Sequence, residues 1–264
     1  MDDSLFSSLE FSRIRLLLGK KNLLKLQQSR IAIFGLGAVG SFALECLARC
    51  GIGYFKLVDF DEIRASNLNR HLFALHSTIG KSKTELSALR IKDINPNIIV
   101  ETHQELFRSV FASQILDTPL DFVVDAIDSV NPKAGLIIEA TKRNIPVITA
   151  MGAAAKLNPS RVRCSDISEV YGCHLCHHVR RRLRKAGIKN GITAVWSDEA
   201  AQEPLEPISE EMQENTFKQG RVRLPLPSVI FVPATVGIMV AHHVIASLLN
   251  LPASTLSPPP YGRK

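Results

Sequence analysis

Short apolar runs alternate with longer amphipathic stretches between residues 29 and 155 of the chain. The runs are rich in β-branched and aromatic residues, and the stretches between them repeat apolar residues at the spacing of a helix face. We expect strands at 31–34, 54–58, 98–101, 121–125 and 146–150. We expect helices at 39–49, 81–94 and 132–143. Apolar strands separated by amphipathic helices are typical of a parallel sheet covered on both faces. The pattern therefore predicts an α/β fold with a Rossmann-like, doubly wound, mostly parallel sheet.

The segments on either side of this core differ in character. Apolar residues at helical spacing in 5–26 predict two short N-terminal helices. Beyond the core we expect a strand at 161–165, a strongly basic helix at 170–186, and an apolar strand at 230–232 that leads into a last helix. The polar, acidic segment 199–220 has no period and predicts a mobile loop or crossover. We therefore expect a single domain with N-terminal helices (1–28), a Rossmann-like core (29–155), a substrate or crossover part (156–252) and a tail (253–264).

One apolar run, from residue 229 to residue 251, is nearly long enough to span a bilayer. Pro233 divides the run, and His242 and His243 lie in its middle. Because ionisable pairs are costly in lipid, we expect a buried helix of a folded protein here, and we do not expect membrane association.

Composition and charge narrow the class of protein. Hydrophobic residues make up 45% of the chain and charged residues 22%, which excludes a disordered or fibrous protein. The net charge of +7 suits a polyanionic partner such as RNA, although many soluble proteins are basic without such a partner. The five cysteines are an odd number, and the first residues lack the profile of a secretory signal. We therefore expect a cytoplasmic protein.

The cysteines do not favour a zinc site. Cys173 and Cys176 form one Cys-x-x-Cys pair, whereas structural zinc is commonly held by two such pairs. Cys46 and Cys50 fall on the expected helix 39–49, and Cys164 stands alone. A site shared between two subunits, or completed by histidine, is the alternative.

The first expected strand runs directly into Gly35-Leu-Gly37-Ala-Val-Gly40, which opens a helix. Glycines at this spacing permit a tight turn and a close approach of the backbone to phosphate, which lies at the helix N-terminus. Asp59 ends the next strand, where a carboxylate can accept hydrogen bonds from ribose hydroxyls. The turn predicts a nucleotide site without deciding between NAD and ATP.

Polar residues downstream of Asp59 favour a triphosphate. Arg70 and Lys83 can neutralise its charge, and Asn67 and Asn69 can donate hydrogen bonds to it. A dinucleotide-dependent oxidoreductase has no need of these cations, and this argues against that class.

Two carboxylates at the end of the strand 121–125 have different expected roles. Asp125 still lies in the strand and is the candidate structural residue. Asp128 lies beyond the strand end, where open α/β sheets bind ligands, and is the candidate ligand of Mg²⁺.

The motifs GLGAVGS, LVDFDEIRASNLNR, GKSK, INPN and DAIDS resemble those of the ubiquitin-activating-like (ThiF/MoeB-type) superfamily of adenylating enzymes. The resemblance covers about residues 10 to 155 in order and implies a homodimer that activates a carboxylate with ATP. It implies ATP contacts from Gly35, Gly37, Ala38, Gly40, Asp59, Asp61, Asn67, Asn69, Arg70, Lys83 and Asp128. It implies catalytic roles for Arg70, Lys83 and Asp128, with Mg²⁺ at Asp128, and for Arg13, which would reach the phosphates bound by the partner subunit.

Within the superfamily, the stretches DAIDSVNPKAGLI, HHVRRRLRKAGIK and PSVIFVPATVGIMVA resemble the tRNA threonylcarbamoyladenosine dehydratases. That resemblance extends over most of the chain and implies ATP-driven cyclisation of the threonylcarbamoyl group on tRNA. Two residues depart from the superfamily's pattern. His71 stands where a glutamine commonly follows the arginine, and Asn69 stands where sulfur-carrier enzymes usually have glutamine.

Several alternatives remain open at this point. The basic run Arg180, Arg181, Arg182, Arg184 and Lys185 is either the tRNA-facing surface or a solvated helix face. An adenylyltransferase for the C-terminal glycine of a ubiquitin-like sulfur carrier is the alternative function, and a sulfur-transfer or electron-transfer protein is a further candidate partner.

Overall fold

A seven-stranded sheet forms the centre of the protein, in a computed structural model that describes residues 9–206 and 226–252. The strand order is β3-β2-β1-β4-β5-β7-β6; β6 runs antiparallel to β7, and the other neighbours pair in parallel. The strands are β1 (Arg30–Phe34), β2 (Tyr54–Val58), β3 (Ile99–His103), β4 (Phe122–Asp125), β5 (Val147–Ala150), β6 (Val162–Asp166) and β7 (Thr193–Ser197). The predicted Rossmann-like, mostly parallel sheet is confirmed.

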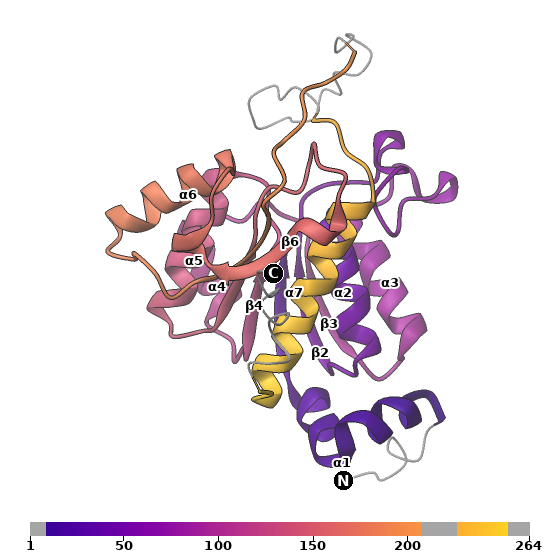
Figure 1. Cartoon of the computed structure of the whole chain (residues 1–264). Coiled ribbons are helices and arrows are strands. Elements are labelled where there is room, and N and C mark those ends of the chain that lie inside the picture. Colours follow the sequence, from indigo (N-terminus) through magenta and orange to yellow (C-terminus); the bar gives the residue numbers. More distant parts are fainter. Residues whose placement is uncertain (1–8, 207–225, 253–264) are drawn as a thin grey trace, which may run out of the picture.

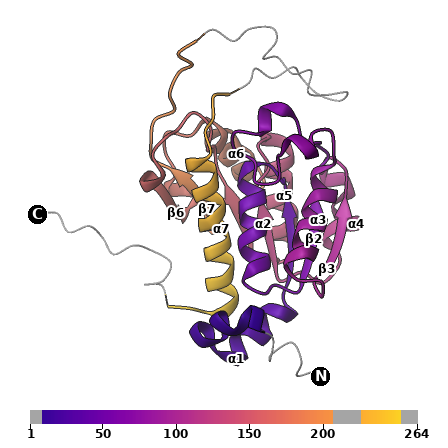
Figure 2. The ribbon, with the colours of Figure 1, turned by 90° about the vertical axis from the view of Figure 1, so that its right-hand side faces the viewer.

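Helices cover both faces of this sheet (Figure 1). One face carries α2 (Ala38–Arg49), α3 (Lys83–Ile94) and α7 (Phe231–Leu249), and the other carries α4 (Ala112–Leu116) and α5 (Val130–Lys142). The helix α6 (His174–Lys185) packs against α5, and α1 (Ser12–Gln28) lies beyond the end of the sheet where the chain enters β1 (Figures 1 and 2). Short 3-10 helices lie at Leu9–Phe11, Ala65–Asn67, His76–Thr78, Ser109–Phe111, Pro159–Arg161 and Ile167–Glu169.

The alternation of side chains along β1 explains the two layers. Ile31 and Ile33 pack into the core beneath α2 and α7, whereas Ala32 and Phe34 pack into the core beneath α4 and α5. All four side chains are fully buried, as expected for a central strand covered on both faces.

The last helix is part of the core. In the described residues, α7 alone is long and apolar enough to cross a membrane, but more than half of its most apolar window is buried. It lies along α2 in both views (Figures 1 and 2), and a Cβ on Gly237 would collide with the Val39 carbonyl and the Phe42 side chain. Only glycine permits this close approach, so α7 is a helix built to pack against α2.

Two sequence predictions need correction, and one strand was not predicted. The strand expected at 230–232 is wrong because α7 begins at Phe231, and Pro233 sits in its first turn, where a missing N–H costs nothing. The basic helix begins at His174 rather than at residue 170, since Gly172 adopts a left-handed φ of 63°. The strand β7 was not predicted. The two predicted N-terminal helices are confirmed, because Gly19 has a non-helical φ of 81° and ψ of 159° and divides α1 in two.

Parts of three predicted segments lie outside the described residues. These are residues 1–8 of the N-terminal segment, which include the first residues of the predicted helices, residues 207–220 of the predicted loop 199–220, and the tail 253–264.

Candidate nucleotide and adenylation site

The glycine turn lies where the chain order of the sheet reverses, between β1 and β4. Gly35 has a left-handed φ of 85°, and a Cβ there would lie 2.7 Å from the Ala126 carbonyl oxygen of the loop after β4. A Cβ on Gly40 would collide with the Gly35 carbonyl. At Gly37, by contrast, an added Cβ would meet nothing within 4 Å, so the backbone there faces open space. This is the arrangement that lets a phosphate approach the N-terminus of α2.

Asp59, at the end of β2, is joined to this turn. Its carboxylate accepts hydrogen bonds from the Leu36 N–H (2.5 Å) and from the Asp61 N–H (2.8 Å). Burial raises the pKa of the Asp59 carboxyl, and the positive charge of Lys83 opposes that rise. The sequence predicts a ribose contact for Asp59, and the structure puts its carboxylate directly beside the glycine turn.

Lys83 is buried in the same corner, on the first turn of α3. Its Nζ lies 2.9 Å from the Asp61 carboxylate, and its backbone N–H donates to the Asp61 carbonyl at 3.1 Å. The Ser82 hydroxyl caps the helix by accepting from the Glu85 N–H. Asp61 therefore orients Lys83, a role that the sequence analysis did not assign to it.

The loop between β2 and α3 carries Arg70 and two asparagines. The Arg70 guanidinium donates to the Ser66 carbonyl (2.7 Å) and to the Asn69 side-chain oxygen (2.9 Å). Asn69 in turn donates to the Ser228 carbonyl at 2.8 Å, which joins this loop to the segment before α7. The Asn67 side chain accepts from the Arg64 N–H at 3.2 Å and shapes the turn from within.

His71 follows Arg70 and is buried against the glycine turn. Its Nε2 lies 2.6 Å from the Leu36 carbonyl oxygen. Burial lowers the pKa of His71 to about 4, and the charges of Lys83 and Arg70 add to that effect. His71 therefore joins the loop that carries Arg70 to the glycine turn. Sequence reasoning marked His71 only as a departure from a pattern.

The two aspartates after β4 have distinct surroundings. Asp125 is fully buried, and its carboxylate lies 2.7 Å from the Lys133 Nζ and accepts from the Thr149 hydroxyl at 2.6 Å. This buried group joins β4, α5 and β5 beneath the site, so Asp125 is structural. Sequence reasoning missed Lys133 and Thr149, because no local pattern connects residues that meet only in the folded chain.

Asp128 is exposed in the loop after β4, and the Ser129 hydroxyl donates to its carboxylate at 3.2 Å. Among the described residues, no group of three or more His, Cys, Asp or Glu side chains is arranged to hold a metal by itself. A lone carboxylate fits Mg²⁺, which is usually held by one or two carboxylates together with substrate phosphates.

A family model described as the ThiF family matches residues 11–261. The chain belongs to the ThiF family. A relative from Bacillus subtilis (strain 168), named tRNA threonylcarbamoyladenosine dehydratase, is 40% identical over 241 residues, which cover 91% of this chain and 95% of the relative. The crystal structure of Escherichia coli TcdA, a tRNA N6-threonylcarbamoyladenosine dehydratase, in complex with ATP matches with a TM-score of 0.80 at 29% identity, over 91% of this chain and 94% of that chain. The complex of TcdA with AMP matches with a TM-score of 0.81 at 30% identity, with the same coverage.

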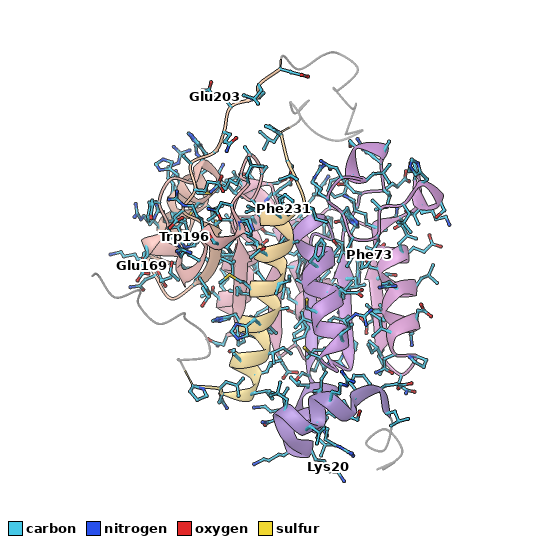
Figure 3. All side chains as sticks on the ribbon, turned by 45° about the vertical axis from the view of Figure 1, so that its right-hand side comes forward. Lys20, Phe73, Glu169, Trp196, Glu203 and Phe231 are labelled. Carbon is cyan, nitrogen blue, oxygen red and sulfur yellow. The ribbon has the colours of Figure 1, made fainter. Side chains whose placement is uncertain are left out.

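One site residue of this ThiF-family chain lies apart from the others. Arg13 is exposed on α1, which precedes β1 and therefore lies at the amino end of the strands. Figure 3 shows Lys20, on the same helix, at the opposite end of the molecule from Phe231, where α7 begins. Within one chain, the structure does not bring Arg13 to the glycine turn.

The basic run of this ThiF-family chain occupies α6, but its side chains differ in what they contact. Arg180 donates to the carbonyl oxygens of Ile167, Ser168 and Val170, at 3.4, 2.9 and 2.7 Å, and therefore holds the segment before the helix. Arg182 donates to a carbonyl of its own helix. The remaining cations of the run are exposed: Arg181, Arg184 and Lys185.

The cysteine pair caps this helix. The Cys173 Sγ accepts from the Cys176 N–H at 3.4 Å, and the Cys176 side chain is buried against the Ile167 carbonyl. All five cysteines are free thiols.

Proposed function

We propose that this chain catalyses the ATP-dependent dehydration of threonylcarbamoyladenosine in tRNA through an acyl-adenylate. The observation that carries the proposal is that Asp59, Lys83 and the loop that carries Arg70 are all joined to one open glycine turn, at the carboxyl ends of the strands. The similarity to the B. subtilis dehydratase over nearly the whole length of both chains supports the same substrate. The ATP and AMP complexes of TcdA support ATP as the activating nucleotide.

The chemistry requires activation because a free carboxylate is a poor acyl donor. The carboxylate of the threonylcarbamoyl group attacks the α-phosphorus of ATP, an O–P bond forms, and pyrophosphate leaves. A nitrogen or the carbonyl oxygen of the same group then attacks the activated carbonyl carbon, and AMP leaves as a proton is released. Because the attacking atom is tethered close to the carbonyl, no enzyme nucleophile is needed.

The residues of the site position ATP and neutralise its charge. The glycine turn and the N-terminus of α2 receive phosphate, while Asp59 faces the ribose. Lys83 and Arg70 stabilise the charge that develops on the leaving pyrophosphate. Asp128 is the residue that would hold Mg²⁺, which when bound neutralises phosphate charge.

The partners follow from the same proposal. A homodimer places Arg13 of one subunit at the phosphates bound by the other, as the superfamily resemblance implies. The exposed cations of α6, Arg181, Arg184 and Lys185, face the tRNA backbone. The protein acts on tRNA in the cytoplasm.

Pyrophosphate release separates this function from adenylation of a sulfur carrier. The purified protein is incubated with ATP and Mg²⁺, and either tRNA bearing threonylcarbamoyladenosine or a ubiquitin-like protein ending in glycine is added. We expect release with the modified tRNA and none with the same tRNA lacking the modification. Release with the carrier protein alone would replace the proposal by the alternative function.

A further inference from the structure

The hydrogen bonds of His71 determine which of its ring nitrogens carries the proton. Nε2 lies 2.6 Å from the Leu36 carbonyl oxygen, which can only accept, so Nε2 carries the hydrogen. Nδ1 lies 3.1 Å from the Phe73 backbone nitrogen, whose N–H can only donate, so Nδ1 carries none. The imidazole is therefore neutral and has a single tautomer.

The Leu36 peptide is held from both sides. Its N–H donates to the Asp59 carboxylate, and its carbonyl accepts from His71. Leu36 lies between Gly35, whose left-handed conformation makes the turn, and Gly37, whose α-carbon faces open space. The side chains of Asp59 and His71 therefore fix the orientation of the Leu36 peptide, within the turn that is proposed to receive a nucleotide phosphate.

His71 also belongs to the loop that carries Arg70. The His71 N–H donates to the Asn67 carbonyl at 2.9 Å, and the residue is 5% exposed. A displacement of this loop must therefore move either the imidazole or the glycine turn.

We propose that His71 is a positioning residue for ATP, which acts by donating its Nε2 hydrogen to the Leu36 carbonyl and so fixes the glycine turn relative to Arg70. The proposal rests on the proposed function for the identity of the nucleotide. The Nδ1 contact with Phe73 serves the local fold only.

Two substitutions separate the contacts of the two ring nitrogens. In His71→Gln the side-chain amide nitrogen reaches about as far as Nε2 and can still donate to Leu36, whereas the acceptor for Phe73 is lost. In His71→Asn the side-chain oxygen takes the place of Nδ1 and can accept from Phe73, whereas the link to Leu36 is lost. Each variant leaves one backbone group without its hydrogen-bond partner, so we expect the two substitutions to reduce the stability of the fold by similar amounts.

The affinity for ATP with Mg²⁺ is measured by isothermal titration in the absence of tRNA, and thermal unfolding is followed on the same samples. We expect His71→Asn to weaken ATP binding by about tenfold and His71→Gln to keep it within about twofold, with similar losses of Tm. Equal effects of the two substitutions on ATP affinity, or a larger effect of His71→Gln, would overturn the proposal. Since this measurement needs no tRNA, an inactive wild-type protein in the tRNA assay would count against the proposed function alone.

A third variant, His71→Ala, tests the same hydrogen bond if His71→Asn does not fold. His71→Ala leaves a space that added imidazole can occupy, and imidazole has an N–H to donate to Leu36. We expect imidazole to restore ATP affinity and 1-methylimidazole, which has no N–H, to leave it low. Equal rescue by the two compounds would contradict a donated hydrogen bond.

Discussion

At the scale of single residues, Lys83 and Arg70 differ in how firmly the fold holds them. The Lys83 side chain is 9% exposed and is oriented by Asp61, so its charge is fixed before any ligand arrives. Arg70 is half-buried and bonded to Ser66 and Asn69 in its own loop. A buried, fixed cation costs little reorganisation when charge develops on phosphate, and we therefore expect Lys83→Ala to reduce activity more than Arg70→Ala does.

His71 makes the stability of the protein depend on pH. Its pKa is lowered from 6.5 to about 4 in the folded state, mainly by burial. Below pH 6.5 the His71 imidazole is protonated in the unfolded chain but stays neutral in the folded protein. The free energy of unfolding is therefore unaffected by His71 above pH 6.5 and decreases as pH falls towards 4. The loss corresponds to about 3 kcal/mol. Urea unfolding of the wild type and of His71→Gln at a series of pH values checks this, because the wild type should lose more stability over that interval. Parallel curves for the two proteins would contradict it.

At the scale of elements, the features that could be predicted are those that depend on residues close together in the sequence. The glycine turn, the strands around it and the cations of the β2–α3 loop could be predicted because each depends on neighbouring residues. The strand β7 was not predicted, because it lies beyond the alternating stretch 29–155 and becomes evident only through its pairing with β5 and β6. The buried group formed by Asp125, Lys133 and Thr149 could not be predicted, because these residues meet only in the folded chain.

Substitution of Gly37, the N-cap of α2, and of Gly237 in α7 separates an effect on ATP binding from an effect on stability. Gly237→Ala places a Cβ against the backbone of α2, and we expect a loss of about 1–3 kcal/mol in the free energy of unfolding. Gly37→Ala places its Cβ in open space, so stability should hold within about 0.5 kcal/mol while ATP affinity falls by at least about tenfold. Urea unfolding and ATP titration of both variants check the pair. Unchanged ATP binding in Gly37→Ala would mean that phosphate does not approach this turn.

The arginines of α6 divide into two groups. Removing Arg181, Arg184 and Lys185 together should weaken tRNA binding and reduce the slope of log affinity against log salt by about one for each cation removed. Arg180→Ala should instead lower Tm, because Arg180 holds three carbonyls of the preceding segment. Filter binding of tRNA at several salt concentrations distinguishes them. An unchanged salt slope in the triple variant would mean that tRNA does not bind at Arg181, Arg184 and Lys185.

At the scale of the whole molecule, the helix α1, which carries Arg13, lies beyond the amino end of β1, whereas the glycine turn follows the carboxyl end of β1 (Figure 1). If Arg13 serves the partner's site, Arg13→Ala and Arg70→Ala each inactivate a homodimer, yet a mixed dimer has one intact site. Random exchange of subunits should therefore restore about a quarter of wild-type activity. The activity of mixtures of the two inactive proteins checks this, and mixtures that stay inactive under conditions of demonstrated subunit exchange would rule out a shared site.

Dehydration of threonylcarbamoyladenosine can be measured on the modified nucleoside itself. The protein is incubated with ATP, Mg²⁺ and tRNA bearing threonylcarbamoyladenosine, and the digested nucleosides are analysed by mass spectrometry. We predict the loss of one water from the modified adenosine, and this loss should depend on ATP. Lys83→Ala should abolish it. Lys81→Ala, which alters an exposed lysine just before α3, should retain it. An unchanged nucleoside mass with the wild-type protein, or full conversion by Lys83→Ala, would contradict the account.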